Sequence, residues 1–447
     1  MRAVLYPSEI SGHVAAPPSK SMAHRALICA ALATGESRVA NLSASQDITA
    51  TLAAMRLLGA VAEEAGGDDR PVRFFQRENA GECPQRPGSL IIKGTGGLPF
   101  APAAGPVDCC ESGSTLRFLI PLFSLTGAPV RFTGRGRLME RPQDVYARLF
   151  AQRGLTFSQH AEGITVHGAL PAGEYALAGN VSSQFISGLL FALPLLSGDS
   201  VIRITPPFES RSYVDLTLRA LADFGVRAAF TDENTIAVPG GQTYCPCSYT
   251  VEGDDSQAAF LAVLGAARGG VAVTGLQADS LQGDRAILDI LARCGARITR
   301  ANGAVLFEKS VLRGTEIDLA DCPDLGPVLM VLGALCTGET VIRNAARLRM
   351  KESDRIAAME QELRKMGAEL SSTQDTVTVQ GGALHAADNL YGHNDHRVVM
   401  ALAVAAYAAG VPAAIEGAEA VNKSWPDFFE TVRALGGRVE LTDEHRA

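Results

Sequence analysis

The sequence predicts an α/β protein of six repeated units, divided between two domains of three units each. A helix-like run that ends on glycine and a small residue occurs six times, at intervals of about seventy residues after a longer first interval. These glycines are Gly59, Gly154, Gly225, Gly295, Gly367 and Gly436. An earlier apolar run in each unit also ends on glycine, at Gly35, Gly127, Gly198, Gly270, Gly338 and Gly410. Because glycine commonly follows the last residue of a helix, each unit contains two helices.

The two helices of a unit differ in character. The first is apolar nearly all round, as in SQFISGLLFALPLLSG, which predicts a helix buried on every side. The second is amphipathic: in the fifth unit Ile356, Met359, Leu363 and Met366 form one apolar stripe. Hairpins follow in RITRANGAVLFEK, with its Asn-Gly turn, and in AELSSTQDTVTVQGG. The repeated unit is therefore helix, strand, helix and hairpin.

The sixth unit stops after one strand, so another segment must complete its sheet. We expect the strand SGHVAA, residues 11–16, to do so, which brings both chain ends into one domain. The predicted first domain is residues 1–18 plus 250–447, and the second is residues 19–249. Residues 66–88 are rich in glycine, proline and charge, which predicts an exposed insertion.

Composition and charge exclude several classes of protein. The chain of 447 residues is 47% hydrophobic, as is ordinary for a globular protein, and no apolar run reaches the roughly 18 residues of a membrane helix. The net charge of −8 argues against nucleic acid or an anionic membrane as partner. The nine cysteines are scattered, and neither Cys109-Cys110 nor the pair Cys245 and Cys247 has zinc-finger spacing. We expect a cytoplasmic monomer without a disulfide framework.

Charged residues gather at the predicted starts of the second helices. An acid near each start suits the helix dipole: Asp47, Asp144, Asp215, Asp284, Asp354 and Asp427. Basic residues at the same places oppose the dipole, so capping does not explain them. They are Arg135, Arg137, Arg141, Arg211, Arg347, Arg349, Lys351, Arg355 and Lys423. Binding of an external anion would explain these residues.

The buried helices also begin with polar segments. PPSKSMAHRAL, ESGSTLRFL, NVSSQFISGLL, GDDSQAAFL and GHNDHRVVM are rich in serine, asparagine and aspartate, and several add lysine or arginine. A helix start offers N–H donors that bind phosphate or carboxylate groups. Taken singly, Ser21, Ser114 and Ser182 are explained as N-caps. Their repetition in both halves favours a small polyanion bound in a cleft between the domains.

Three interpretations of these charges remain open at this point. They are a repeat scaffold with solvated loops, a passive binder of phosphorylated ligands, and an enzyme with two anionic substrates. Asp324, Glu352 and His396 favour the enzyme. A carboxylate between Lys351 and Arg355 weakens a purely anion-binding field, but it serves acid–base catalysis. No GxxxxGK[ST] motif is present, which disfavours phosphoryl transfer by a P-loop.

Nine short segments are distributed over nearly the whole chain. They are PPSKSMAHRAL, ESGSTLRFL, MERP, SSQF, SRSY, VEGDDS, LRMKESDR, NDHR and NKSWPDFF. In this order they resemble the family of 5-enolpyruvylshikimate-3-phosphate synthases. The resemblance implies an inside-out α/β barrel fold with two domains of three repeats and the active site between them. It also implies transfer of an enolpyruvyl group from phosphoenolpyruvate to the 5-hydroxyl of shikimate 3-phosphate, with release of phosphate and no metal or organic cofactor.

The resemblance also implies roles for single residues. Those for shikimate 3-phosphate are Lys20, Ser21, Arg25, Ser182, Ser183, Gln184, Ser210, Tyr213, Asp324 and Lys351. Those for phosphoenolpyruvate are Lys20, Gly113, Arg117, Arg141, Gln184, Arg355, Arg397 and Lys423. Asp324 is the implied base for the 5-hydroxyl and Glu352 the implied acid for the methylene carbon. Lys20 is implied in catalysis as the lysine that both substrates share.

Two residues depart from the family pattern and receive no role here. Glu111 stands where asparagine is frequent, and Arg347 stands where some members carry asparagine. An alternative with the same fold is the enolpyruvyl transferase that acts on UDP-N-acetylglucosamine. Its usual reactive cysteine would align near GRGRLMERP, where this chain has none. Together with SKSMAHR, this favours shikimate 3-phosphate as the substrate.

Overall fold

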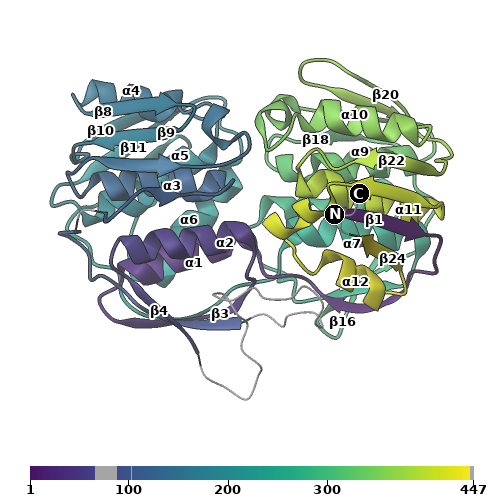
Figure 1. Cartoon of the computed structure of the whole chain (residues 1–447), viewed down its shortest axis with the longest axis horizontal. Helices are drawn as coiled ribbons and strands as arrows, with labels where there is room; N and C mark the ends of the chain where they lie inside the picture. Colours follow the sequence, from purple (N-terminus) through teal and green to yellow (C-terminus); the bar gives the residue numbers. More distant parts are fainter. Residues whose placement is uncertain (66–87, 102, 443–447) are drawn as a thin grey trace. The chain divides into compact units, whose positions relative to one another are not determined.

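The computed structural model describes residues 1–65, 88–101 and 103–442, which form two compact units (Figure 1). The split unit combines Met1–Pro17 with residues 252–442, and the inserted unit comprises the described residues from 18 to 251. Within the described residues, each unit has three four-stranded sheets and its own hydrophobic core. Residues 66–87, most of the predicted insertion, lie outside the described part of the chain.

The inserted unit contains three pairs of helices. They are α1 (Lys20–Leu32), α2 (Gln46–Leu57), α3 (Gly113–Ser124), α4 (Asp144–Gln152), α5 (Ser183–Ala192) and α6 (Arg211–Asp223). The strands are β3 (Glu36–Leu42), β4 (Val61–Glu64), β5 (Gly88–Lys93), β6 (Val107–Asp108), β7 (Val130–Thr133), β8 (Thr156–His160), β9 (Gly163–His167), β10 (Glu174–Ala178), β11 (Ser200–Thr205), β12 (Ala229–Asp232), β13 (Thr235–Val238) and β14 (Ser248–Thr250). As predicted, the first helix of each pair is buried on nearly every side.

The split unit repeats this plan. Its helices are α7 (Asp255–Arg268), α8 (Ile287–Arg293), α9 (Gly326–Leu335), α10 (Arg355–Lys365), α11 (His396–Ala409) and α12 (Phe428–Ala434). Its strands are β1 (Arg2–Tyr6), β2 (Gly12–Ala15), β15 (Val271–Thr274), β16 (Arg297–Ala301), β17 (Ala304–Glu308), β18 (Glu316–Asp318), β19 (Glu339–Arg343), β20 (Glu369–Ser372), β21 (Val377–Gln380), β22 (Ala387–Tyr391), β23 (Ala413–Glu416) and β24 (Arg438–Thr442). The buried helices α7, α9 and α11 pack against one another at its centre.

All six sheets follow one order, with a parallel pair of strands at one edge and antiparallel pairing beyond it. In the sheet β18-β19-β21-β20, the parallel strands β18 and β19 precede and follow the buried helix α9. The predicted hairpins β16–β17 and β20–β21 supply the antiparallel part of their sheets. The repeated unit is thus confirmed.

One strand assignment was wrong. The segment SGHVAA contains β2, which pairs in parallel with β15 in the fourth unit and not with the sixth. The sixth sheet is completed by β1, which lies antiparallel between β23 and β24. Figure 1 shows β1 in purple among the yellow segments from the other end of the chain. Alternating burial of Ala3 and Leu5 makes β1 a half-buried strand that fits this central position. Both chain ends nevertheless meet in one sheet.

An edge strand lies just before each point where the chain passes from one unit to the other. β2 precedes α1 in the chain but joins the sheet of β15, whereas β14 precedes α7 but joins the sheet of β3. Each unit therefore receives its first edge strand from the segment that leads into the other unit. Within the described residues, no helix is long and apolar enough to span a membrane.

The six glycines that end the second helices share one backbone conformation. Gly59, Gly154, Gly225, Gly295, Gly367 and Gly436 all have positive φ, between +67° and +111°. Glycine adopts this region without the steric cost that a Cβ atom imposes. The requirement for a left-handed residue after each helix explains why the repeat was visible in the sequence.

Candidate functional site

In the inserted unit, Lys20 is the first residue of the buried helix α1. Its Nζ donates to Asp47 Oδ2 on α2 at 2.7 Å, and both side chains are mostly buried. Asp47 is therefore the counter-ion of a lysine that was predicted to bind ligand. This role comes in addition to its favourable interaction with the dipole of α2. The pair fixes the ammonium group at the start of α1.

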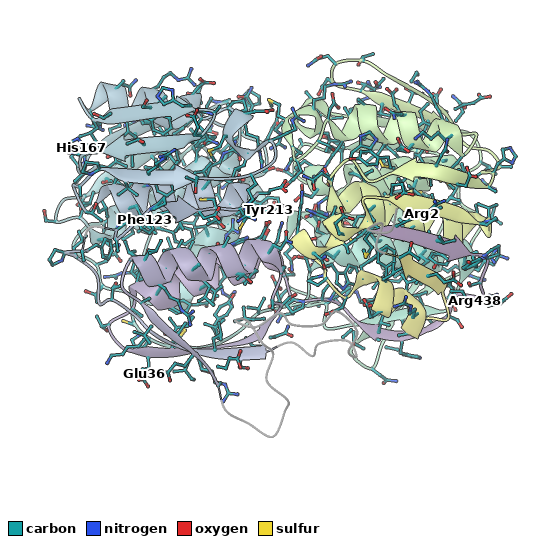
Figure 2. The ribbon with its side chains drawn as sticks, in the orientation of Figure 1. Arg2, Glu36, Phe123, His167, Tyr213 and Arg438 are labelled. Carbon is teal, nitrogen blue, oxygen red and sulfur yellow. The ribbon has the colours of Figure 1, made fainter. Side chains whose placement is uncertain are left out.

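Arg25 lies one turn further along α1 and is 2% exposed. Its guanidinium donates to Thr217 Oγ1 at 2.9 Å, to the Ser21 carbonyl at 2.6 Å and to the Tyr213 carbonyl at 2.8 Å. Burial lowers the pKa of Arg25 to about 10. Tyr213, labelled in Figure 2, belongs to the first turn of α6. Arg25 thus ties two predicted shikimate 3-phosphate residues, Ser21 and Tyr213, to each other.

Arg117 joins α3 to α5. Its Nη1 donates to Gln184 Oε1 at 2.9 Å, and Gln184 Nε2 donates to Ser114 Oγ at 3.0 Å. The Arg117 guanidinium also lies 4.7 Å from the ring centre of Phe185. These contacts bring together Arg117 and Gln184, which the resemblance assigned to the same ligand.

Arg141 packs directly on Gly113. The side chain is 7% exposed, and its Nε is buried without a hydrogen-bond partner in the described part of the chain. A Cβ atom added to Gly113 would lie 2.6 Å from Arg141 Nη1, so only glycine leaves room for this guanidinium. A buried cation of this kind is stabilised when an anion reaches it.

The serines at the helix starts divide into two kinds. Ser182 caps α5, where its Oγ accepts from Gln184 N at 3.3 Å, but Ser21 and Ser114 are not caps. Ser19 and Ser112, two residues earlier in each case, cap α1 and α3. Ser183 and Ser210 are buried, and Ser210 precedes α6 with φ of +55°. The N-cap explanation therefore fails for Ser21 and Ser114.

In the split unit, the opening residue of α10 organises a second cluster. Arg355 is 1% exposed and bonds three carboxylates: Asp395 Oδ2 at 2.8 Å, Glu352 Oε2 at 2.8 Å and Asp324 Oδ1 at 3.1 Å. The 3₁₀ turn Pro323–Leu325 carries Asp324, and Asp354 caps α10 by accepting from Ala357 N at 3.0 Å. Both predicted catalytic carboxylates therefore contact the same guanidinium.

Asp324 is the most heavily paired carboxylate of this cluster. Lys351 Nζ lies at 3.0 Å from Oδ1, and Arg397 Nη2 at 3.1 Å from Oδ2, in addition to the contact with Arg355. Burial alone would raise the pKa of Asp324, but Arg397, Lys351 and Arg355 outweigh it and hold the pKa well below its usual range. Asp324 is therefore ionised, and it is a weak base while these cations surround it.

Arg397 and Lys423 complete the cluster. Arg397 is the second residue of α11, whose N-cap Asp395 accepts from Arg397 N at 2.9 Å. Lys423 ends the 3₁₀ turn Ala418–Lys423, and its Nζ donates to the Asn394 carbonyl at 2.5 Å. Asp395 was not among the predicted site residues, although the NDHR segment at a helix start was a usable signal. His396, which favoured an enzyme, is buried at the start of α11.

One polar helix start does not suit an anion. Asp254 caps α7 by accepting from Gln257 N at 2.9 Å, and Asp255 beside it is 1% exposed. Burial, together with Asp254, Glu252 and Asp284, raises the pKa of Asp255 to about 7. This negative environment separates α7 from the helix starts that carry lysine or arginine, although the sequence GDDSQAAFL had been grouped with them.

The two departures from the family pattern occupy different places. Arg347 is 9% exposed, and its Nη2 donates to the Ala320 carbonyl in the segment leading to Asp324. Glu111 is half-buried, immediately before the cap of α3. Within the described residues, no cluster of three or more histidine, cysteine, aspartate or glutamate side chains could hold a metal ion. The eight described cysteines are free.

Fold and side chains together define a class of protein: a repeat-built α/β protein whose buried cations lie near helix starts and pair with carboxylates. The family model of EPSP synthase (3-phosphoshikimate 1-carboxyvinyltransferase) matches residues 4–432. The chain belongs to this family.

Relatives and solved structures agree with this membership. The chain is 42% identical over 436 residues to a 3-phosphoshikimate 1-carboxyvinyltransferase of Clostridium kluyveri, covering 97% of each chain. It is 40% identical over 445 residues to the one of Clostridioides difficile, covering 98% of each. A solved EPSP synthase from Acinetobacter baumannii shares 26% identity at a TM-score of 0.77, covering 98% of this chain and 100% of that one. The enolpyruvyl transferase NikO from Streptomyces tendae, at 16% identity and a TM-score of 0.75 over 98% of each chain, shares the fold. The inside-out barrel fold is thereby confirmed.

Proposed function

We propose that the protein transfers the enolpyruvyl group of phosphoenolpyruvate to the 5-hydroxyl of shikimate 3-phosphate and releases phosphate. The observation that carries this proposal is the contact of Asp324 and Glu352 with one guanidinium, in a chain whose relatives carry this activity in their names. The alternative, transfer to UDP-N-acetylglucosamine, is not favoured, because the matching family model and these curated relatives are 3-phosphoshikimate 1-carboxyvinyltransferases.

The inserted unit supplies the groups proposed for shikimate 3-phosphate. They are Lys20, Ser21, Arg25, Ser182, Ser183, Gln184, Ser210 and Tyr213, joined by Asp324 and Lys351 from the split unit. The network of Arg25 with the Ser21 and Tyr213 carbonyls supports a preorganised phosphate site, in which Arg25 holds the lining in place as well as adding charge.

Phosphoenolpyruvate is proposed to bind Lys20, Gly113, Arg117, Arg141, Gln184, Arg355, Arg397 and Lys423. The buried guanidinium of Arg141, with no carboxylate in contact among the described residues, supports this role. Because residues of both units take part, the proposal requires both clusters to act on one pair of substrates.

The reaction follows as addition and elimination. Glu352 gives a proton to the methylene carbon of phosphoenolpyruvate, while the 5-hydroxyl oxygen bonds to the neighbouring carbon and passes its proton to Asp324. The tetrahedral intermediate then returns a proton from its methyl group to Glu352 and expels phosphate, which takes up the proton held by Asp324. This step restores the double bond and the starting protonation of both carboxyl groups. Arg and Lys groups already in place stabilise the charge that moves onto the leaving group.

The pairing of Asp324 suggests how its basicity is controlled. Three cations hold its pKa low without substrate. When the anionic groups of phosphoenolpyruvate engage Arg355 and Arg397, less positive charge remains on Asp324, so its pKa rises toward the usual value. The base becomes effective only when substrate is present.

Phosphate release from purified protein mixed with shikimate 3-phosphate and phosphoenolpyruvate tests the function. We expect turnover with this pair and none when UDP-N-acetylglucosamine replaces shikimate 3-phosphate. Turnover with UDP-N-acetylglucosamine alone would favour the alternative function. No phosphate release with either acceptor would indicate a ligand-binding scaffold. The proposal also includes a cytoplasmic monomer that binds no nucleic acid, as the net charge of −8 favours.

A further inference from the structure

Glu362 is a carboxylate that the proposed reaction does not use. It lies on α10, two turns beyond Arg355, and its side chain is 0% exposed. Three donors reach it: His393 Nε2 at 2.9 Å from Oε1, and Tyr391 N at 2.8 Å and Lys365 Nζ at 2.7 Å from Oε2. Burial raises the pKa of Glu362, but these donors outweigh it and hold the pKa below its usual value. A buried carboxylate with three donors fixes the groups that surround it.

The segment that Glu362 holds is conformationally demanding. Residues 391–395 run from the last residue of β22 to the cap of α11, and both His393 and Asn394 have positive φ, +50° and +51°. Two successive non-glycine residues in the left-handed region persist only where the surroundings impose them. Glu362 contacts this segment at its start through Tyr391 and in the strained turn through His393.

The same segment bonds to three residues proposed to bind phosphoenolpyruvate. Asp395 at its end orients Arg355, the Asn394 carbonyl accepts from Lys423, and Arg397 N donates to Asp395. Helix α10 is therefore bonded to the segment at two places, by Arg355 at its first residue and by Glu362 near its last turn.

We propose that Glu362 and His393 are positioning residues, which hold segment 391–395 so that Arg355, Arg397 and Lys423 converge on phosphoenolpyruvate. Neither touches substrate; both act through the turn between them. This inference rests on the proposed function, because it assumes that these three cations bind phosphoenolpyruvate.

Two variants and a matched control test it. Glu362→Gln keeps the size of the side chain and removes its charge, and His393→Asn removes the ring while asparagine tolerates positive φ. Glu360→Gln is the control, because Glu360 lies on the same helix and, in the described part of the chain, its carboxylate pairs with the exposed Arg364 at 3.5 Å. We expect both variants to raise the KM for phosphoenolpyruvate about tenfold and the double variant to be no worse than Glu362→Gln alone, since the two residues act as one unit.

If Glu362 and His393 had a purely structural role, their variants would lower the melting temperature and would not change the KM for phosphoenolpyruvate more than the KM for shikimate 3-phosphate. The inference is overturned if folded variants keep the parental KM for phosphoenolpyruvate, if the KM values of both substrates rise equally, or if Glu360→Gln has the same effect. If Glu362→Gln does not fold, His393→Asn alone decides by the same criteria. A parent without turnover would refute the proposed function instead; calorimetric titration of phosphoenolpyruvate into parent and variants then decides this inference.

Discussion

Replacement of Gly113 by alanine should weaken phosphoenolpyruvate binding while leaving the fold intact. The added Cβ would lie 2.6 Å from Arg141 Nη1, 3.0 Å from Cζ and 3.1 Å from Nη2, whereas ordinary contact begins at 3.4 Å. The guanidinium must therefore retreat by about 0.8 Å, and a misplacement of about 1 Å in a binding group can cost up to 100-fold. We expect the KM for phosphoenolpyruvate to rise roughly 10- to 100-fold.

Stability should respond differently from binding. The clashing atoms are the end of a flexible side chain, and Gly113 is the first residue of α3, where alanine is the better helix former. We therefore expect the free energy of unfolding to change by less than about 1 kcal/mol. Denaturant titration measures this change, and initial rates with each substrate varied in turn give the two KM values.

Two controls isolate the cause. At Gly382 an added Cβ meets no atom within 4 Å, so Gly382→Ala should behave like the parent. In an Arg141→Lys background, which lacks the guanidinium, Gly113→Ala should add little further effect. An unchanged KM for phosphoenolpyruvate in Gly113→Ala, or an equal rise for shikimate 3-phosphate, would refute the reasoning from this contact.

Three further predictions concern other residues. Glu352→Gln should lower turnover by roughly two to four orders of magnitude, because it removes the proton donor, while calorimetry still detects shikimate 3-phosphate; parental turnover would leave Glu352 as a local charge only. Asp255 binds a proton between pH 3.8 and about 7 in the folded state but not in the unfolded one, so stability should fall as pH rises through that range. Asp255→Asn should flatten this slope and stabilise the protein at pH 8 by up to about 4 kcal/mol in thermal or denaturant unfolding, and an unchanged slope would contradict the burial argument. Trp425 follows Lys423 by two residues, is 3% exposed and packs on Phe428. Its fluorescence emission should therefore change when phosphoenolpyruvate binds Lys423. Lys423→Ala should abolish this change but leave shikimate 3-phosphate binding intact.

The periodic features of the fold were predictable because each has a local physical cause. Positive φ after every second helix demands glycine, so Gly59 and its five equivalents marked the repeat. The hairpins and the buried helices followed from alternation and from uninterrupted apolar runs.

The errors arose where pairing is not local. β1 and β2 are both short strands near the chain start, and nothing in their alternation says that β2 pairs with β15 about 260 residues away while β1 enters the sixth sheet. Equally, Ser19 and Ser21 are both plausible caps by composition, and only the helix start at Lys20 separates them. The NDHR segment marked Asp395 as a candidate helix cap, but its ion pair with Arg355, 40 residues away, could not be read from the sequence.

The position of β1 has a consequence for synthesis on the ribosome. The described residues of the inserted unit all lie between residues 18 and 251, so they have left the ribosome before most of the split unit is made, and this unit can fold first. β1, by contrast, must wait for β23 and β24, roughly 400 residues later, which at about 5–20 residues per second is a delay of roughly 20–80 s. During that time the apolar face of Ala3 and Leu5 has no sheet to enter. β1 is thus made early but placed late, and a bulky group attached next to β1 would act on the final step by which its sheet is assembled.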